Sequence, residues 1–130
     1  HDLMVEERME KVQRVANYIP ELKVDGAESG KLLVVGWGGT YGHLLSAVQE
    51  VRAEGIDVSF AHFDYIMPLP KNTADVFEKF DKILVCELNS GQFVNYLRAL
   101  MPQFKYEQFN KVQGQPFLVQ EITTAIKENF

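Results

Sequence analysis

Two short polar segments of this 130-residue chain carry the side chains that could take part in chemistry. The first is a glycine-rich turn after a run of apolar residues, and it comprises Gly36, Trp37, Gly38, Gly39, Thr40, Tyr41 and Gly42. The second follows another apolar run and supplies a carboxylate, a hydroxyl and side-chain amides; it comprises Glu87, Asn89, Ser90, Gly91 and Gln92. Glycine turns and helix N-termini present backbone N–H groups that bind anions. These residues are therefore the candidates for contact with a ligand or a partner.

The glycine turn matches a dinucleotide-binding pattern only in part. Gly36 and Gly38 fit the opening of G-x-G-x-x-G, but Tyr41 stands in place of the third glycine and Gly42 comes one residue late. Asp64 could replace the acidic residue that binds ribose, whereas the lysine of a Walker motif is missing. Glycine is also required for a tight strand-to-helix turn and for close helix packing. We favour this structural interpretation of the first turn.

Three interpretations fit the second segment. Glu87, Asn89 and Gln92 could converge on a ligand beside the free N–H groups of a helix N-terminus. Alternatively, Asn89 and Ser90 cap the helix while Glu87 hydrogen-bonds across to the glycine turn. The same groups could also contact another subunit. The sequence leaves these alternatives open.

The remaining candidate residues favour packing over catalysis. His43 and His62 are far apart in the sequence and have no metal-ligand spacing with Cys86 or with a carboxylate. Cys86 lies in an apolar run, which is typical of an inert buried thiol, and Trp37 at a strand end indicates interface packing. No nucleophile, base and orienting group can be assembled into a set. The sequence therefore predicts no catalytic residue and no metal ligand.

Strand-like and helix-like apolar patterns alternate along the chain. Strands are predicted at 21–24, 32–35, 56–63, 83–86 and 104–109. Amphipathic helices are predicted between the later strands and at the end of the chain, and Asn72 is expected to cap the short one that follows it. This alternation predicts an α/β fold with three αβα layers and a mostly parallel sheet. If strands 32–35 and 83–86 are neighbours, the two polar segments meet at their carboxyl ends, where strand order reverses.

The composition indicates one globular domain without a membrane span. The first helical pattern ends before Pro20, which divides the chain into a helix at 1–19 and a domain at 20–130. The net charge of −5, with no clustered Lys or Arg, argues against nucleic acid as a partner. The single cysteine excludes an internal disulfide and a multi-cysteine metal cluster, and it favours the reducing cytoplasm. No apolar run approaches the ~20 residues that span a bilayer.

Four segments together resemble the alpha subunits of 2-oxoacid:ferredoxin oxidoreductases. They resemble the family's strand and glycine turn, its W-P-F-P connection, its glutamate–asparagine–glycine–glutamine signature and its G-R-P-F segment, and they lie at 32–42, 67–70, 87–92 and 114–117. Gln115 replaces the arginine of the last segment, which removes the cation of a possible anion contact. The amino-acid sequence of the glycine turn is closer to that of the family members that act on 2-oxoglutarate. A transketolase-like enzyme would share the fold but fits 87–92 less well.

The resemblance implies a fold like the transketolase C-terminal domain. That fold has a five-stranded mixed sheet in the order 1-3-2-4-5, with strand 1, here 21–24, antiparallel to the others. The resemblance also implies that the helix at 1–19 is a linker from an upstream domain.

Enzymes of this family decarboxylate a 2-oxoacid oxidatively with coenzyme A and reduce ferredoxin, using thiamine diphosphate, magnesium and iron–sulfur clusters. The resemblance implies that other domains carry these cofactors, and that this one is a non-catalytic structural and assembly domain. Its partners would be the rest of the alpha subunit and the beta subunit, in a dimer or higher oligomer. The acidic charge argues against a docking face for ferredoxin, because like charges slow encounter. The alternative is a module that binds coenzyme A, a nucleotide or another anion through 36–42 and 87–92.

Overall fold

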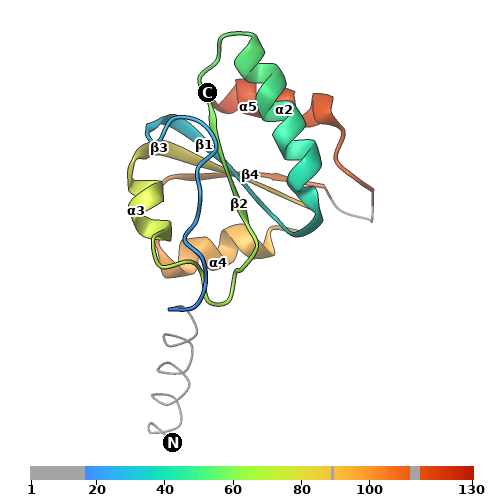
Figure 1. The fold of residues 1–130 in the computed structure, drawn as a ribbon. Coiled ribbons are helices and arrows are strands. Elements are labelled where there is room, and N and C mark those ends of the chain that lie inside the picture. The colour runs from blue at the N-terminus through green and yellow to red at the C-terminus, as the bar shows by residue number, and fades with distance from the viewer. Residues whose placement is uncertain (1–16, 89, 112–114) are drawn as a thin grey trace, which may run out of the picture.

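Four strands alternate with helices along the chain, as the apolar pattern predicts (Figure 1). The structure is a computed structural model and describes residues 17–88, 90–111 and 115–130. Its elements are β1 (Gly30–Trp37), the short 3-10 helix η1 (Gly38–Thr40), α2 (Tyr41–Ala53), β2 (Ser59–Phe63), α3 (Thr73–Glu78), β3 (Phe80–Glu87), α4 (Gln92–Leu100), β4 (Tyr106–Asn110) and α5 (Val119–Asn129). Within these described ranges, no helix is both long and apolar enough to cross a membrane.

The strands form one parallel sheet in the order β2-β1-β3-β4. The middle of each central strand, 32–35 in β1 and 83–85 in β3, consists of Leu, Val and Ile residues that are buried on both faces. The chain runs from β1 out to β2 and then crosses back over β1 to β3, so strand order reverses between β1 and β3. The predicted neighbourhood of strands 32–35 and 83–86 is confirmed.

The predicted antiparallel strand at 21–24 is wrong. Residues 20–25, here called the strap, make only one antiparallel bridge to β2, between Asp25 and Phe60. Further along the strap, the side chain of Asn72 binds both backbone groups of Leu22. The Leu22 N–H donates to Asn72 Oδ1 at 2.7 Å, and Asn72 Nδ2 donates to the Leu22 carbonyl at 2.9 Å. The side-chain amide of Asn72 therefore pairs both backbone groups of Leu22, and the strap joins the sheet only at Asp25.

The same contact corrects the role predicted for Asn72. It stands at the N-cap position of α3, but its side chain makes no capping hydrogen bond there. Instead, its side chain binds the backbone of Leu22 in the strap. The two residues are 50 positions apart, so no local sequence pattern predicts this contact. The helix predicted for 1–19 lies outside the described residues except for 17–19, which form a turn.

Helices cover both faces of the sheet (Figure 1). On one face, α2 and α5 pack on each other and on a core that includes Leu44, Val48 and Ile122. On the other face, α3 and α4 cover a core with a cluster of edge-to-face aromatic rings that includes Phe63 and Phe77. The predicted three-layer αβα architecture is confirmed, with four parallel strands in place of five mixed ones.

Candidate functional site

The two polar segments meet at the carboxyl edge of the sheet, as predicted. Trp37 ends β1 and Glu87 ends β3, and Trp37 Nε1 donates a hydrogen bond to Glu87 Oε1 at 3.3 Å. The indole also packs against the ring of Phe93, with the ring centroids 5.9 Å apart. The first turn and the second segment are thus joined at the point where strand order reverses.

Glu87 caps α4 from the end of the neighbouring strand. Its side chain is completely buried, and its two carboxylate oxygens accept the N–H groups of Phe93 and Val94 at 2.8 and 2.9 Å. These are the second and third N–H groups of the helix, which a capping side chain normally satisfies. The carboxylate also lies at the positive end of the helix dipole. Two of the N–H groups that could have bound an anion are therefore occupied by Glu87.

One alternative had Asn89 and Ser90 capping α4 while Glu87 hydrogen-bonds to the glycine turn; the bond from Glu87 is present, but Ser90 does not hold the N-cap position. The N-cap residue of α4 is Gly91, whose φ of 96° lies in the left-handed region, and Glu87 supplies the acceptors instead. Glu87 takes the capping role in place of the Ser90 hydroxyl, because its carboxylate at the end of β3 reaches the N–H groups of both Phe93 and Val94. Asn89 lies outside the described residues. Gln92 opens the helix with an exposed side chain.

The glycines of the first turn have different structural requirements. A Cβ at Gly36 would overlap the Leu44 side chain and would lie 2.9 Å from the Thr40 hydroxyl, so any larger residue would force these side chains to move. Gly38 has a φ of 67°. By contrast, a Cβ at Gly39 or Gly42 would meet no described atom within 4 Å. The structural interpretation therefore accounts for the first two glycines and leaves the last two unexplained by this chain's own packing.

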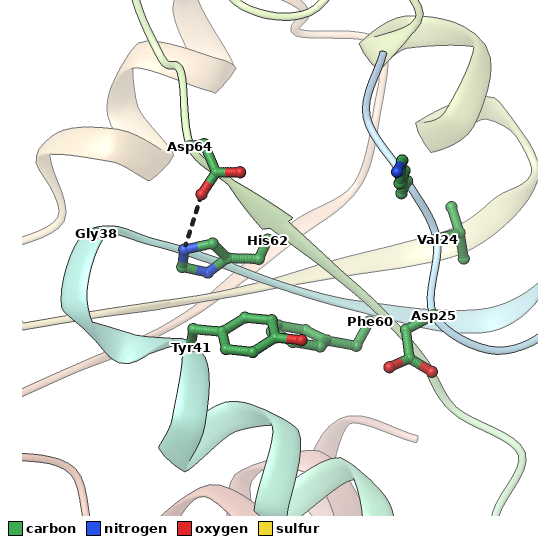
Figure 2. A pocket seen from close by; sticks show the side chains of 8 residues that line it. Val24, Asp25, Gly38, Tyr41, Phe60, His62 and Asp64 are labelled. Atoms are coloured by element: carbon green, nitrogen blue, oxygen red, sulfur yellow. Dashed lines mark ion pairs between the residues drawn. The ribbon is translucent and has the colours of Figure 1, made fainter. Parts of the chain in front are cut away.

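A cleft of about 610 Å³ opens beside the first turn, between the strap and the end of β2 (Figure 2). Two residues of the first turn, Gly38 and Tyr41, and the candidate acid Asp64 line it. The full lining is Lys23, Val24, Asp25, Gly38, Tyr41, Phe60, His62 and Asp64. The sequence pattern favours surface or core packing for His62 and gives no signal for the strap residues. The spacing of Phe60, His62 and Asp64 was the available signal, because residues two apart on a strand share one face.

His62 lies in the wall of this cleft, with Asp64 and Tyr41 on either side (Figure 2). Its Nε2 is 3.8 Å from Asp64 Oδ1, and the Tyr41 ring lies edge-on to the imidazole with centroids 5.2 Å apart. Nδ1 is buried and has no hydrogen-bond partner of normal geometry within the described ranges. Burial lowers the pKa of His62, and the Asp64 carboxylate and the Gly38 backbone only partly oppose this.

We expect the free energy of unfolding to increase as pH rises towards 6.5 and then to level off. Below its ordinary pKa of about 6.5, His62 binds a proton in the unfolded chain but not in the folded one, so stability falls as pH falls through this window. Urea denaturation between pH 5 and pH 8 measures this slope. His62→Gln should reduce the slope; an unchanged slope in the variant would assign the pH dependence to other groups.

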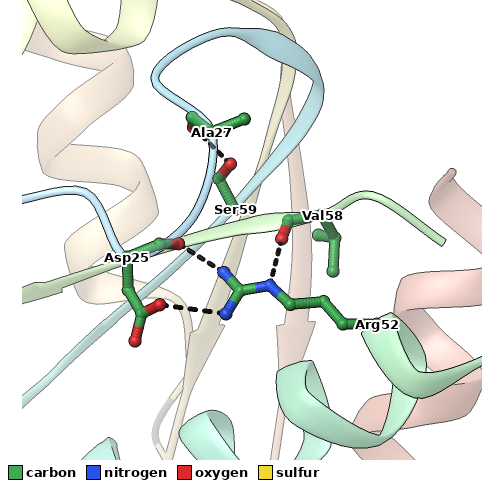
Figure 3. Close-up of polar contacts among 5 residues, drawn as sticks. All are labelled: Asp25, Ala27, Arg52, Val58 and Ser59. Atoms are coloured by element: carbon green, nitrogen blue, oxygen red, sulfur yellow. Dashed lines mark hydrogen bonds and ion pairs between the residues drawn. The ribbon is translucent and has the colours of Figure 1, made fainter. Parts of the chain in front are cut away.

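Arg52 fastens the other end of the strap (Figure 3). Its guanidinium donates to the Val58 carbonyl at 2.8 Å, to the Asp25 carboxylate at 2.9 Å and to the Asp25 carbonyl. Ser59 Oγ adds a hydrogen bond to the Ala27 carbonyl at 2.5 Å. The strap is thus held at Leu22 and again at Asp25, and the cleft lies between the two attachments.

Arg52→Ala should lower the free energy of unfolding by about 1–2 kcal/mol, because a partly buried cation with three acceptors is lost. The amide of Phe60, which donates to Asp25, should exchange faster with deuterium. Arg98→Ala is the matched control, since Arg98 is exposed and should change stability by less than about 0.5 kcal/mol. Equal effects of the two variants would contradict the role of Arg52.

Cys86 and His43 take the positions that the sequence predicted. Cys86 is buried in β3, and burial together with the Glu87 carboxylate raises the pKa of its thiol to about 12. His43 is exposed on α2. In the part of the chain that the structure describes, no three His, Cys, Asp or Glu side chains lie close enough together to hold a metal ion.

The fold is that of a transketolase-type α/β domain. A split-gene transketolase structure superposes with a TM-score of 0.64 over 82% of this chain and 41% of that one, at 13% identity. Residues 30–122 match the family model of pyruvate:ferredoxin oxidoreductase core domain II. The chain belongs to that family, and the predicted resemblance is confirmed.

The similar proteins are subunits of larger oxidoreductases. The 2-oxoglutarate oxidoreductase subunit KorA of Mycobacterium tuberculosis is 36% identical over 98% of this chain and 19% of its own length. The alpha subunit of 2-oxoacid:ferredoxin oxidoreductase 1 from Aeropyrum pernix is 26% identical over 95% of this chain and 20% of its own. This chain spans about a fifth of the length of these relatives.

One solved structure is similar over nearly the whole chain. It is a 2-oxoglutarate:ferredoxin oxidoreductase from Magnetococcus marinus with 2-oxoglutarate, coenzyme A and succinyl-CoA bound. It superposes with a TM-score of 0.87 at 29% identity, over 99% of this chain and 23% of that one. The match to alpha-subunit chains agrees with a domain of the alpha subunit of a 2-oxoacid:ferredoxin oxidoreductase.

Proposed function

We propose that this chain is a non-catalytic assembly domain of the alpha subunit of a 2-oxoglutarate:ferredoxin oxidoreductase in the cytoplasm. The 2-oxoglutarate type is supported by the similarity to KorA and to the Magnetococcus enzyme. The complete enzyme would oxidatively decarboxylate 2-oxoglutarate to an acyl-CoA and reduce ferredoxin. The rest of the alpha subunit and the beta subunit would be the direct partners, in a dimer or higher oligomer.

The observation that carries this proposal is the buried Glu87 carboxylate. At the point where strand order reverses, the Glu87 carboxylate caps α4 and accepts a hydrogen bond from the Trp37 indole. An acid that accepts three hydrogen bonds within the domain is a structural group and is not placed to bind substrate. This favours the structural interpretation of 87–92 over the ligand interpretation.

The described residues do not fit the cofactors that the family implies. Magnesium and iron–sulfur clusters need several oxygen or thiolate ligands, and no suitable group of side chains is present in the described ranges. The Cys86 thiol is buried, and its pKa is raised to about 12, which disfavours the thiolate that binds iron. The proposal therefore places thiamine diphosphate, magnesium and the clusters on other domains or subunits.

Exposed apolar residues at the carboxyl edge of the sheet support an assembly role. Large apolar side chains that are at least about two-fifths exposed follow the ends of all four strands, and they are Tyr41, Tyr65, Met67, Leu88 and Leu118. Aromatic residues and Met are enriched in protein interfaces. The proposed contact surface is therefore the carboxyl edge of the sheet.

The test compares this edge with the opposite one in the full-length alpha subunit. Tyr65→Asp combined with Met67→Asp should reduce co-purification with the beta subunit at least tenfold, because two charges are placed in an apolar interface. Leu100→Asp, at the end of α4 on the opposite edge, is 53% exposed and should assemble normally. Thermal unfolding of the isolated variants separates loss of assembly from loss of folding. Normal assembly and turnover of the double variant would contradict the proposal.

A second candidate function is binding of coenzyme A, a nucleotide or another anion by 36–42 and 87–92. The open space around Gly39 and Gly42 favours it, because a ligand could approach the backbone closely there. The Glu87 carboxylate opposes it, because it occupies the N–H groups of α4. Calorimetric titration with coenzyme A and AMP decides between them: heat of binding would support this function, and no heat would rule it out.

A further inference from the structure

The outer edge of β2 is only partly covered by the strap. Asp25 and Phe60 exchange two backbone hydrogen bonds, of 2.7 and 2.9 Å. The backbone N–H and C=O of His62, two residues after Phe60, point to the same edge of β2, because alternate residues of a strand direct their backbone groups to the same side. Within the described ranges, the N–H and C=O of His62 make no backbone hydrogen bond to the strap or to any other segment outside the strands. In a continuous ladder they would pair with Lys23. On the N-terminal side of Asp25, however, the strap runs away from β2, and Leu22 binds Asn72 instead.

The space between the two separated backbones is elongated. Lys23 of the strap and His62 of β2 both line the 610 Å³ cleft. A second hollow of about 280 Å³ shares Lys23, His62 and Asp64 with it and continues to Tyr65 and Pro70. The first volume lies within the range of about 300–1,000 Å³ that holds small ligands, but the two hollows together form a groove along a strand edge. This shape fits an extended chain better than a compact molecule.

The side chains around the groove define the chemistry of its occupant. Tyr41 and Tyr65 stand at its two ends, and each is 49% exposed. Glu21 and Asp64 contribute two carboxylates against the one ammonium of Lys23, while the Asp25 carboxylate is already paired with Arg52. The groove is thus acidic and has aromatic ends. It favours a segment that carries apolar and basic side chains.

We propose that this groove binds an extended segment from another part of the same subunit, which carries apolar and basic side chains and adds to the edge of β2 by hydrogen bonds to the His62 backbone. Addition of a strand to a sheet edge is a common mode of peptide recognition. The inference rests on the proposed assembly function, and the segment would come from the remaining four-fifths of the subunit that the relatives' lengths indicate. The Asp64 carboxylate, with its side chain 81% exposed, would pair with a basic residue of the segment.

The test uses the 130-residue chain and the peptide Ac-Val-Lys-Val-Lys-Val-Lys-NH2 as a probe, followed by the backbone amide signals in NMR. We expect saturable changes at Lys23, His62 and Asp64. The same peptide with N-methyl groups on alternate residues, which cannot pair with a strand edge, should bind at least tenfold more weakly. This control changes the probe and leaves the protein's folding untouched. Replacing the lysines by glutamates should weaken binding by at least fivefold at low salt.

Three results would overturn the inference: no change at His62 and Asp64, equal binding of the methylated peptide, or changes confined to another face such as α5. Asp64→Asn should weaken binding of the lysine peptide several-fold without changing the protein's thermal stability. The assembly test has a separate readout, because it measures co-purification of the full subunit with the beta subunit and not peptide binding, and Met67 lies outside the lining of the groove. Loss of assembly there without peptide binding here would reject the groove alone, and normal assembly with peptide binding would reject the assembly function alone.

Discussion

Glu87→Ala is expected to lower the free energy of unfolding by about 3–5 kcal/mol, which makes it the most destabilising polar substitution that we predict. The carboxylate is completely buried and accepts hydrogen bonds from the Phe93 and Val94 amides and from the Trp37 indole. Removing it leaves these donors unsatisfied in an apolar environment and also leaves a cavity. Urea denaturation followed by circular dichroism at pH 7 gives the difference directly.

Two further variants show whether the effect comes from these hydrogen bonds. Glu87→Gln retains one acceptor oxygen and most of the volume, so its cost should be smaller, about 1–2 kcal/mol. Glu128→Ala removes an exposed carboxylate from α5 and should change stability by less than about 0.5 kcal/mol. If Glu87→Ala proved as mild as Glu128→Ala, the carboxylate would have no structural role and the ligand interpretation of 87–92 would be favoured again.

Gly36→Ala should destabilise the domain by about 1–3 kcal/mol, although it adds a single methyl group. That methyl would overlap Leu44 and crowd the Thr40 hydroxyl, so α2 would have to move away from β1. Leu44 is itself fully buried in the core on that face of the sheet, which limits its ability to move. Thermal and urea unfolding of the purified variant measure the loss.

Gly42→Ala, in the same turn, is the matched control and should stabilise the domain by about 0.5–1 kcal/mol. Gly42 lies in the first turn of α2 with open space around it, and alanine has the higher helix propensity. A loss of stability in this variant would mean that the fold itself also requires glycine at position 42. The opposite signs of the two substitutions would instead separate the glycine needed for packing from a glycine that the isolated domain does not need.

Much of the fold could be predicted because it depends on local patterns. The apolar runs around Val34 and Leu84 are long enough for a strand and have no polar face, so burial in the middle of a parallel sheet was the only stable arrangement. The glycine turn and the polar segment follow these runs directly. Neighbouring parallel strands bring their carboxyl ends together, so the meeting of Trp37 and Glu87 followed from the chain order.

The errors concern polar side chains whose partners are distant in the sequence. Asn72 was expected to cap α3, and residues 21–24 were expected to form a strand; one pair of hydrogen bonds between Asn72 and Leu22, 50 residues apart, overturns both expectations. In addition, nothing in the sequence shows that Tyr41 and the strap lie beside His62. Local periodicity carries no information about such contacts.

The sequence by itself determined the strands, their layers and the edge at which the polar segments gather, because apolar periodicity and chain order fix which surfaces must be buried. Only the tertiary structure decided which acceptor caps α4, where the strap leaves β2 and that a groove opens beside His62. Each of these depends on a hydrogen bond between segments that folding brings together, and a side chain with several possible partners chooses among them by geometry.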